Sequence, residues 1–233
     1  MMIPQIVFVT GTDTGSGKTV LTALLVHYLR GQGVNALAMK PVCTGPRDDV
    51  HLLQSIQGNQ LSDDLINPFY YKKPAAPAVA SRRYKTQITI QGIIKSIDRV
   101  SRHCEMVIVE GAGGLLVPLN EKGDTWVDLI KRLGCPVIIA ATNKLGTINH
   151  TLLTVDKLKS TGISRISTVL INIPYKAKKD TSKRTNLPIL SKILDKTPVM
   201  EVPNLGAGEI KKAQIVKGSK KMQKILAQIL DTV

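Results

Sequence analysis

Apolar runs of strand length alternate with segments of helical periodicity along most of this chain. The apolar runs occupy residues 6–9, 34–39, 105–109, 136–141, 166–171 and 199–202. Between and after them, helical patterns occupy residues 21–29, 47–56, 88–100, 126–133, 187–194 and 219–230, with a further helix from the turn at 143–150 to about residue 159. Strands that alternate with helices predict a single α/β domain over residues 1–233, with a mostly parallel β-sheet and helices on both faces.

Two stretches interrupt this alternation. Residues 61–83 are irregular and contain three prolines, but their apolar content is too high for a disordered segment. We therefore expect an ordered loop there. Residues 176–184 are strongly basic, and we expect an exposed connection.

The composition supports a buried parallel sheet. Hydrophobic residues make up 43% of the 233 positions, but aromatic residues only 3%, so the core must consist of Ile, Leu, Val and Ala. No apolar run approaches the ~20 residues that span a bilayer, and no basic region precedes an apolar one at the N-terminus. The cysteines, Cys43, Cys104 and Cys135, lack metal-binding spacing. These features predict a cytoplasmic protein with reduced thiols.

The chain is unusually basic, with 32 Lys and Arg against 17 Asp and Glu and a net charge of +15. Such a charge can indicate a nucleic-acid partner. However, the charges are spread along the chain and few aromatic residues lie among them for base stacking. A solvated basic surface, or attraction of anionic substrates, explains the charge as well. We therefore expect no nucleic-acid and no membrane partner.

The stretch from Gly11 to Thr19 follows the first apolar run and has the layout of a phosphate-binding loop. Glycines allow backbone N–H groups to approach phosphate oxygens, and the following helix N-terminus adds partial positive charge. Lys18 would reach the outer phosphates, and the Thr19 hydroxyl is placed to bind Mg²⁺. The usual first glycine is replaced by Thr12, and Gly11 lies one position earlier. The alternative is a glycine-rich turn without a ligand.

Other polar residues follow two later apolar runs. Lys40 comes directly after residues 34–39, where open α/β sheets hold ligands, although an exposed lysine at a strand end is also common. Glu110 follows residues 105–109 and precedes several glycines, which favours a metal-side carboxylate over a simple capping acid. In the helix that opens at residues 47–50, Asp48 is best explained as a cap, whereas Asp49 can face the metal.

These motifs together closely resemble the dethiobiotin synthetases, a family of the P-loop NTPase superfamily. The resemblance runs from Val7 to about residue 209, and the family's loop has the same spacing. Its carriers are Gly11-Thr12-Asp13-Thr14 with Gly17-Lys18-Thr19, Lys40-Pro41-Val42 with Gly45, Val109-Glu110-Gly111-Ala112-Gly113-Gly114, and Lys144-Leu145-Gly146 with Ile148-Asn149-His150.

The resemblance implies a P-loop NTPase-like fold and an enzyme that makes a cyclic urea. Its substrates would be 7,8-diaminononanoate, CO₂ and ATP, with Mg²⁺, and its products dethiobiotin, ADP and phosphate. One amine takes up CO₂ as a carbamate, the γ-phosphate activates the carbamate, and the second amine closes the ring at high effective molarity.

The resemblance also implies roles for individual residues. Lys40 and Lys18 would be catalytic, and Thr19, Asp49 and Glu110 would hold Mg²⁺. The nucleotide would contact Gly15, Ser16, Gly17, Lys18, Thr19, Val20, Asp49, Glu110, Gly111, Ala112, Gly113, Asn172, Ile173, Pro203, Asn204 and Leu205. The diamine and carbamate would contact Thr14 and Thr44, and Gly146, Thr147, Ile148 and Asn149 of a second subunit, which makes a homodimer necessary.

Two other functions compete with this one. A ParA/MinD-like positioning ATPase would explain the charge through attraction to DNA or anionic membranes. Those proteins typically carry a second lysine next to the first glycine of the loop, and here that place is Thr12 or Asp13. An amidotransferase-type synthetase would need a glutaminase domain, for which the chain is too short.

Overall fold

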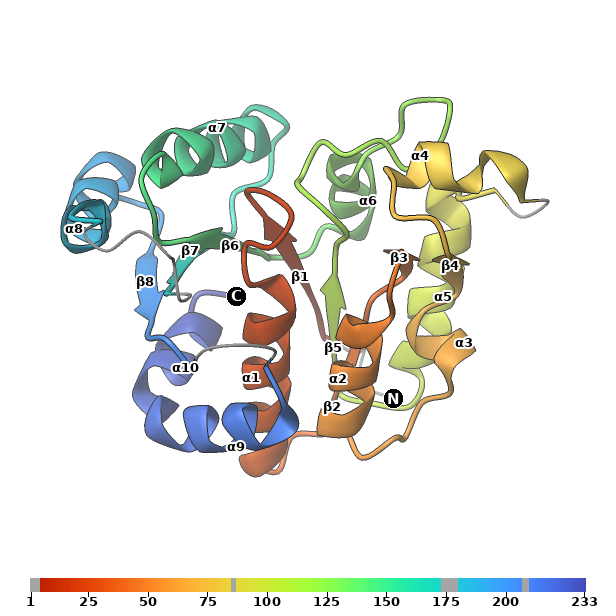
Figure 1. Cartoon of the computed structure of the whole chain (residues 1–233), viewed down its shortest axis with the longest axis horizontal. Helices are drawn as coiled ribbons and strands as arrows, with labels where there is room; N and C mark the ends of the chain where they lie inside the picture. The colour runs from red at the N-terminus through yellow and green to blue at the C-terminus, as the bar shows by residue number, and fades with distance from the viewer. Residues whose placement is uncertain (1–4, 85–86, 173–179, 207–209) are drawn as a thin grey trace.

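The chain forms an open α/β structure around one parallel β-sheet (Figure 1). The computed structural model describes residues 5–84, 87–172, 180–206 and 210–233. Six strands lie in the order β2-β5-β1-β6-β7-β8, and every neighbouring pair is parallel. Their bounds are β1 Gln5–Gly11, β2 Ala36–Met39, β5 Met106–Glu110, β6 Val137–Thr142, β7 Ile166–Ile171 and β8 Val199–Val202. The predicted fold class is confirmed, and the strand ends lie within two residues of the predicted ends.

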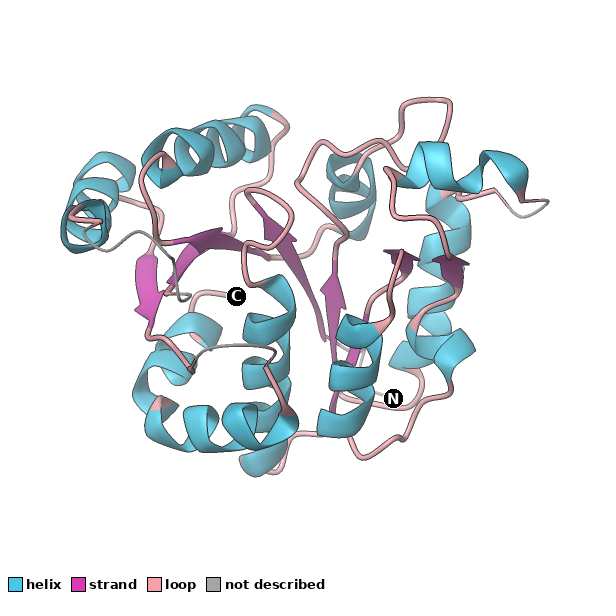
Figure 2. Ribbon diagram, viewed as in Figure 1, coloured by secondary structure: helices cyan, strands magenta, loops and turns pink. Residues whose placement is uncertain are grey.

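Helices cover both faces of this sheet, as Figure 2 shows. One layer contains α1 Lys18–Gly31, α2 Asp48–Ile56, α9 Lys212–Lys221 and α10 Gln223–Leu230. The other contains α5 Ile90–Ser101, α6 Trp126–Leu133, α7 Thr147–Ser160 and α8 Ser182–Leu194. Because helices bury both faces, β6 and β7 are mostly apolar, and all their residues are buried, Ser167 and Thr168 of β7 included.

The core is aliphatic, with one aromatic contact near the functional edge. The rings of Phe8 and Trp126 lie 5.5 Å apart between centroids. Nε1 of Trp126 donates to the carbonyl oxygen of Ala112 at 2.8 Å, so the one polar atom of this buried ring is satisfied. The same bond fixes the glycine-rich segment that follows β5.

The segment at residues 61–83 contains more regular structure than its sequence predicts. It forms the short helices α3 Asp63–Ile66 and α4 Pro77–Ala80, the strand β4 Phe69–Tyr71 and a 3₁₀ turn at Ser81–Arg83. Strand β4 pairs in parallel with β3, Val42–Thr44, in a second, two-stranded sheet. The prediction of an irregular loop was therefore wrong in part, because such short elements depend on distant partners rather than on local periodicity.

Two helix predictions were also wrong in their extent. Helix α8 begins at Ser182, not at residue 187, and contains Pro188 in its interior. A proline inside a helix removes one backbone hydrogen bond and crowds the carbonyl of the preceding turn, yet α8 continues through Pro188. The predicted helix at residues 219–230 is two helices, α9 and α10, that meet at the buried Met222. The basic connection at 176–184 lies partly in α8, and residues 173–179 are outside the described ranges.

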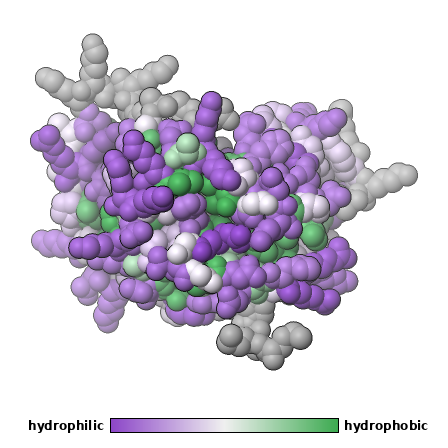
Figure 3. Space-filling view, turned by 90° about the horizontal axis from the view of Figure 1, so that it is seen from below, coloured by the Kyte–Doolittle hydropathy of each residue, from purple (hydrophilic) through white to green (hydrophobic). Residues whose placement is uncertain are grey.

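Hydrophilic side chains cover most of the surface on the side shown in Figure 3, around a smaller apolar area. Helix α9 contributes Lys212, Lys217, Lys220 and Lys221 to the positive charge. Across the described ranges, none of the helices combines the length and the apolar character that crossing a bilayer requires.

Candidate functional site

The carboxyl ends of β1 and β7 meet at the phosphate-binding loop. The loop leaves β1 after Gly11 and enters α1 at Lys18. Gly17 has a φ of +89°, and a Cβ added there would lie 2.9 Å from Cγ2 of Ile171. Glycine is therefore required at this position for both backbone conformation and space. The contact also places the end of β7 directly against the loop.

Lys18 turns back over the phosphate-binding loop. Its Nζ donates to the carbonyl oxygen of Asp13 at 3.0 Å, and the side chain is buried. Burial lowers the pKa of Lys18 to about 8, with Lys40 acting in the same direction and Glu110, Asp49 and Asp13 opposing it. An anionic ligand bound beside Lys18 would stabilise its charged form and raise its pKa.

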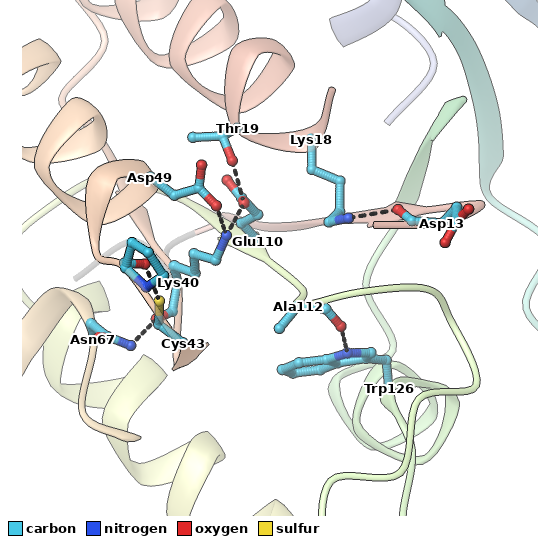
Figure 4. Close-up of polar contacts among 11 residues, drawn as sticks. Asp13, Lys18, Thr19, Lys40, Cys43, Asp49, Asn67, Glu110, Ala112 and Trp126 are labelled. Atoms are coloured by element: carbon cyan, nitrogen blue, oxygen red, sulfur yellow. Dashed lines mark hydrogen bonds and ion pairs between the residues drawn. The ribbon is translucent and has the colours of Figure 1, made fainter. Parts of the chain in front are cut away.

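A cluster of four charged or polar side chains lies beside the loop (Figure 4). Nζ of Lys40 contacts Oε1 of Glu110 at 2.9 Å and also forms an ion pair with Oδ2 of Asp49. The hydroxyl of Thr19 donates to the same Oε1 of Glu110 at 2.7 Å. These residues come from the end of β2, the end of β5, the start of α2 and the first turn of α1. The parallel sheet thus brings together side chains that lie far apart in sequence.

Two hydrogen bonds with residues 66 and 67 hold the backbone of Lys40 in place. Its N–H donates to the carbonyl oxygen of Ile66 at 2.9 Å, and its carbonyl accepts from Nδ2 of the buried Asn67 at 2.8 Å. Asn67 is a positioning residue that the sequence analysis missed, because an Asn before a proline reads as an ordinary turn residue. Lys40 therefore projects from a fixed backbone.

The charges in this cluster stabilise one another. Burial alone would lower the pKa of Lys40, but the carboxylates of Glu110 and Asp49 outweigh it and raise that pKa above its ordinary value. Burial opposes ionisation of Asp49, and Lys40 outweighs it and lowers the pKa of the Asp49 carboxyl. Lys40 and Asp49 are thus both charged at neutral pH.

Oxygen ligands suited to Mg²⁺ gather at the same place. Glu110 is fully buried, and its Oε2 has no hydrogen-bond partner among the described residues. The hydroxyl of Ser16 is likewise buried without a partner in the described ranges. Buried oxygens without partners are unfavourable unless a ligand satisfies them. A hydroxyl and two carboxylates form the hard oxygen set that Mg²⁺ binds together with phosphate oxygens, so the residues fit the ion.

A cavity of about 670 Å³ opens over the loop and the cluster. It brings together the predicted loop residues with Lys40, Asp49, Thr14 and Thr44. Its lining is Thr14, Gly15, Ser16, Gly17, Lys18, Thr19, Val20, Lys40, Cys43, Thr44, Pro46, Asp49, Pro74, Ala75, Ala76, Pro77, Ala112, Gly113 and Val117.

The far wall of this cavity was not predicted as part of the site. It consists of the small apolar residues 74–77 with Val117. The repeated Pro and Ala at 74–77 indicated an ordered loop, but nothing local showed which way the loop faces.

Burial raises the pKa of Cys43, which also lines the cavity, so its thiol remains protonated at neutral pH.

Several of the other residues predicted to contact the nucleotide lie at or near neighbouring strand ends and do not line this cavity. The N–H of Asn172 donates to the carbonyl oxygen of Val202 at 3.0 Å, which sets Asn172 beside residues 203–205. Pro203 and Asn204 are exposed. Gly111 is buried, and a Cβ there would lie 3.2 Å from the Phe8 ring. Ile173 lies outside the described residues.

The predicted substrate residues of the second subunit are grouped at the start of α7. Gly146 and Asn149 are exposed, Ile148 is half-buried, and Thr147 is buried. Thr147 lines a smaller cavity of about 80 Å³ together with Thr14 and Gly15 of the loop. This segment does not line the larger cavity of its own chain.

Comparisons with known proteins agree on the family of this chain. A family model described as an AAA domain matches residues 5–205. The ATP-dependent dethiobiotin synthetase of Thermodesulfovibrio yellowstonii is 38% identical over 85% of this chain and 86% of its own. The Bacillus licheniformis enzyme of the same name is 37% identical over 83% and 86%.

Solved structures match the fold at much lower identity. The MinC:MinD cell division complex of Aquifex aeolicus contains a chain with a TM-score of 0.58 at 12% identity, with 97% of this chain and 96% of that chain covered. The pNOB8 ParA structure bound to nonspecific DNA also has a TM-score of 0.58 at 12% identity, over 99% and 98%. At such identities the likeness concerns the fold alone.

Proposed function

The chain belongs to the family of ATP-dependent dethiobiotin synthetases, and we propose that it closes a cyclic urea from 7,8-diaminononanoate and CO₂ at the cavity above the phosphate-binding loop. Enzymes of this family are ATP-dependent ligases. The observation that carries the proposal for this site is the position of Lys40. It projects from a strand end into the cavity beside the loop and contacts both candidate metal carboxylates.

The proposed reaction has three steps: carbamate formation, phosphoryl transfer and ring closure. One amine of the diamine adds to CO₂ and loses a proton to give a carbamate. A carbamate oxygen then attacks the γ-phosphorus of ATP, and the bond to the bridging oxygen of ADP breaks. Finally the second amine attacks the carbamate carbon, phosphate leaves with its electron pair, and the amine loses its proton. The second amine lies on the same molecule, which gives ring closure a high effective concentration.

Two lysines supply positive charge to these steps. Lys18 would contact the phosphoryl group and offset the charge that develops as it is transferred. Lys40 would stabilise the carbamate oxygens and the transferred phosphoryl oxygens. Both are positioned before the substrates bind, Lys40 by its fixed backbone and Lys18 by its contact with Asp13. Such preorganised charge is effective because it needs no rearrangement during the reaction.

We further propose that Thr19, Asp49 and Glu110 hold Mg²⁺. The buried, unpartnered Oε2 of Glu110 supports this role. When bound, Mg²⁺ would supply positive charge that offsets part of the negative charge of the phosphates. Since Lys40 contacts the same two carboxylates, the ammonium group and the ion would share them.

The two ends of the diamine would bind in different places. Thr14 and Thr44 line the cavity and would contact the amine and carbamate end. The carboxylate end would contact the start of α7, at residues 146–149 of a second copy of this chain, where an exposed helix N-terminus attracts an anion. CO₂ would enter the same cavity.

This arrangement requires a homodimer, and the chain has a suitable apolar surface. A groove of about 460 Å³ runs between residues 150–157 of α7 and residues 114–118. Leu116 and Leu153 line it and are 54% and 62% exposed, and Leu145, one residue before Gly146, is 81% exposed. Exposed leucines grouped in this way favour a protein interface. We propose that a second copy covers them.

The nucleotide base would lie at the ends of β7 and β8. Asn172 has an amide that can both donate to and accept from an adenine edge. Residues 203–205 would line the base, and the contact between Gly17 and Ile171 supports the placement because it sets β7 beside the phosphates.

Phosphate release from ATP tests the proposal. With Mg²⁺ and bicarbonate present, we expect release that depends on added 7,8-diaminononanoate. The matched control omits bicarbonate in CO₂-free buffer, and release should fall to background. Release that ignores the diamine but rises with DNA or anionic lipid would contradict the proposal and would favour a positioning ATPase.

A further inference from the structure

A directed chain of side-chain hydrogen bonds lies next to the proposed base site. Nδ2 of Asn186 donates to Oδ1 of Asn143 at 2.8 Å, and Nδ2 of Asn143 donates to Oε1 of Glu201 at 3.0 Å. Nδ2 of Asn172 donates to the same Oε1. Glu201 in β8 therefore receives one amide N–H from the end of β6 and one from the end of β7.

The carboxylate determines the direction of both amides. An ionised carboxylate only accepts hydrogen bonds, so an amide oxygen turned toward it would be repelled. Asn143 is fixed at both ends, because its Oδ1 also accepts from Asn186, and both side chains are buried. For Asn172, Oδ1 and the second N–H of Nδ2 have no hydrogen-bond partner among the described residues, so both can face a ligand.

We propose that Glu201 is a positioning residue that holds the amide of Asn172 in the one orientation that favours adenine over 6-oxo purines. This inference rests on the proposed function, in which Asn172 contacts the base. Asn172 directly follows Ile171, which touches Gly17 of the phosphate-binding loop. A nucleotide whose phosphates lie in the loop would therefore have its base near this amide.

The selectivity follows from the pattern of donors and acceptors. Adenine offers an amino donor at C6 beside the ring-nitrogen acceptor N1, and an amide oxygen and N–H pair with both. Hypoxanthine carries an oxygen at C6 and a proton on N1 instead, so acceptor would face acceptor and donor would face donor. Turning the amide of Asn172 by half a turn would correct this mismatch but would place its oxygen against Glu201. The carboxylate thus blocks the orientation that a 6-oxo purine needs.

The unmodified protein allows a first test with three nucleotides that differ at C6. We would measure the dissociation constants of ATP, purine riboside triphosphate and ITP by calorimetry. The expected order is ATP tightest, then purine riboside triphosphate, then ITP, which should bind about tenfold more weakly than purine riboside triphosphate. Purine riboside triphosphate only lacks a hydrogen bond, whereas ITP adds a repulsion. Equal affinities for these two would overturn the fixed orientation.

Glu201→Gln tests the source of the selectivity. A glutamine amide can accept or donate, so both orientations of Asn172 become possible. The ratio of ATP affinity to ITP affinity should fall about tenfold, chiefly because ITP binds more tightly. Glu105→Gln is the matched control. Glu105 also accepts an N–H, from Asn35 at 2.8 Å, but it lies just before the amino end of β5, away from the strand ends that form the site. A general loosening of the fold would weaken both nucleotides and leave the ratio unchanged, which would count against the proposal.

Asn172→Ala separates this inference from the proposed base site. If Asn172→Ala weakens ATP and removes the preference over ITP while Glu201→Gln leaves the preference intact, Asn172 reads the base but Glu201 does not orient it. If Asn172→Ala changes neither ATP affinity nor the preference, the base lies elsewhere, and that part of the proposed function fails as well.

Discussion

At the scale of single residues, two lysines lie near the same carboxylates, but their pKa values shift in opposite directions. Lys40 lies between two carboxylates, which raise its pKa above the ordinary value despite burial. Lys18 points away from that pair toward a backbone carbonyl, and burial lowers its pKa to about 8. The first lysine is a permanent cation, whereas the second changes charge near the working pH.

We predict that Lys40→Met removes synthetase activity while the protein still binds ATP. Removing one preorganised cation from a transition state lowers kcat by about 10²–10³-fold in comparable sites. Single-turnover phosphate release measures this effect. Lys131→Met, on the exposed side of α6, is the control and should retain full activity.

The same Lys40→Met substitution should also destabilise the fold. It leaves the fully buried Glu110 without its cation, and an uncompensated buried charge lowers the free energy of unfolding by about 3–5 kcal/mol. Thermal unfolding should show the loss, and Mg²⁺ with ATP should reduce it. An unchanged melting temperature would contradict the ion pair between Lys40 and Glu110.

We also predict a pH dependence of ATP binding that originates at Lys18. Its pKa of about 8 means that the ammonium group loses its proton as the pH rises through that value in the nucleotide-free protein. Bound phosphates favour the charged form, so ATP affinity should fall above about pH 8 and ATP binding should take up protons there. Calorimetry in buffers of different ionisation enthalpy measures this uptake. Proton release on binding would show that the sign is wrong.

At the scale of elements, the phosphate-binding loop depends on a close contact with β7. Gly17 and Gly15 both have positive φ, at +89° and +71°, but only at Gly17 would a Cβ collide with Ile171. Gly15→Ala should therefore cost about 1–2 kcal/mol of backbone strain, and Gly17→Ala more. At about 2–4 °C per kcal/mol for a chain of this size, thermal unfolding separates the two variants. Equal melting temperatures would contradict the contact.

The sequence predicted the site residues that follow long apolar strands better than it predicted the short elements. The phosphate-binding loop, Lys40 and Glu110 were found because each follows an apolar run, and carboxyl ends of parallel strands share one edge. The sequence did not predict the cavity wall at residues 74–77 or the strand pair β3–β4, because their positions depend on residues distant in sequence. Helix α8 was predicted too short because residues 182–184 were assigned to the exposed basic connection, whereas the structure places them in the helix.

The candidate site shows the same division. Thr19, Asp49 and Glu110 were predicted as a set, and the structure brings Thr19 and Asp49 to Glu110 directly and through Lys40. Asn67 holds the backbone of Lys40, and Glu201 is proposed to orient the side chain of Asn172. Nothing in their local sequence distinguishes them from ordinary turn and strand residues. Residues that position others are thus harder to predict than residues that contact ligands.

At the scale of the whole molecule, the account predicts a homodimer formed through the exposed leucines near α7. Leu153→Asp would place a charge in that apolar surface, which should dissociate the dimer, measured by light scattering. Val79→Asp is the matched control, because Val79 is 44% exposed on α4 and does not line the groove. If the unmodified chain is monomeric at assay concentrations, or if Leu153→Asp remains dimeric, the proposed interface is wrong.

The central claim is that this molecule joins carbon from CO₂ to a diamine at the expense of ATP. The most direct measurement supplies radiolabelled bicarbonate with ATP, Mg²⁺ and 7,8-diaminononanoate and follows label in acid-stable product alongside ADP. A free carbamate decomposes in acid, whereas a cyclic urea survives. The account predicts acid-stable label in an amount equal to ADP, and none with Lys40→Met. ADP formation without acid-stable label would contradict it.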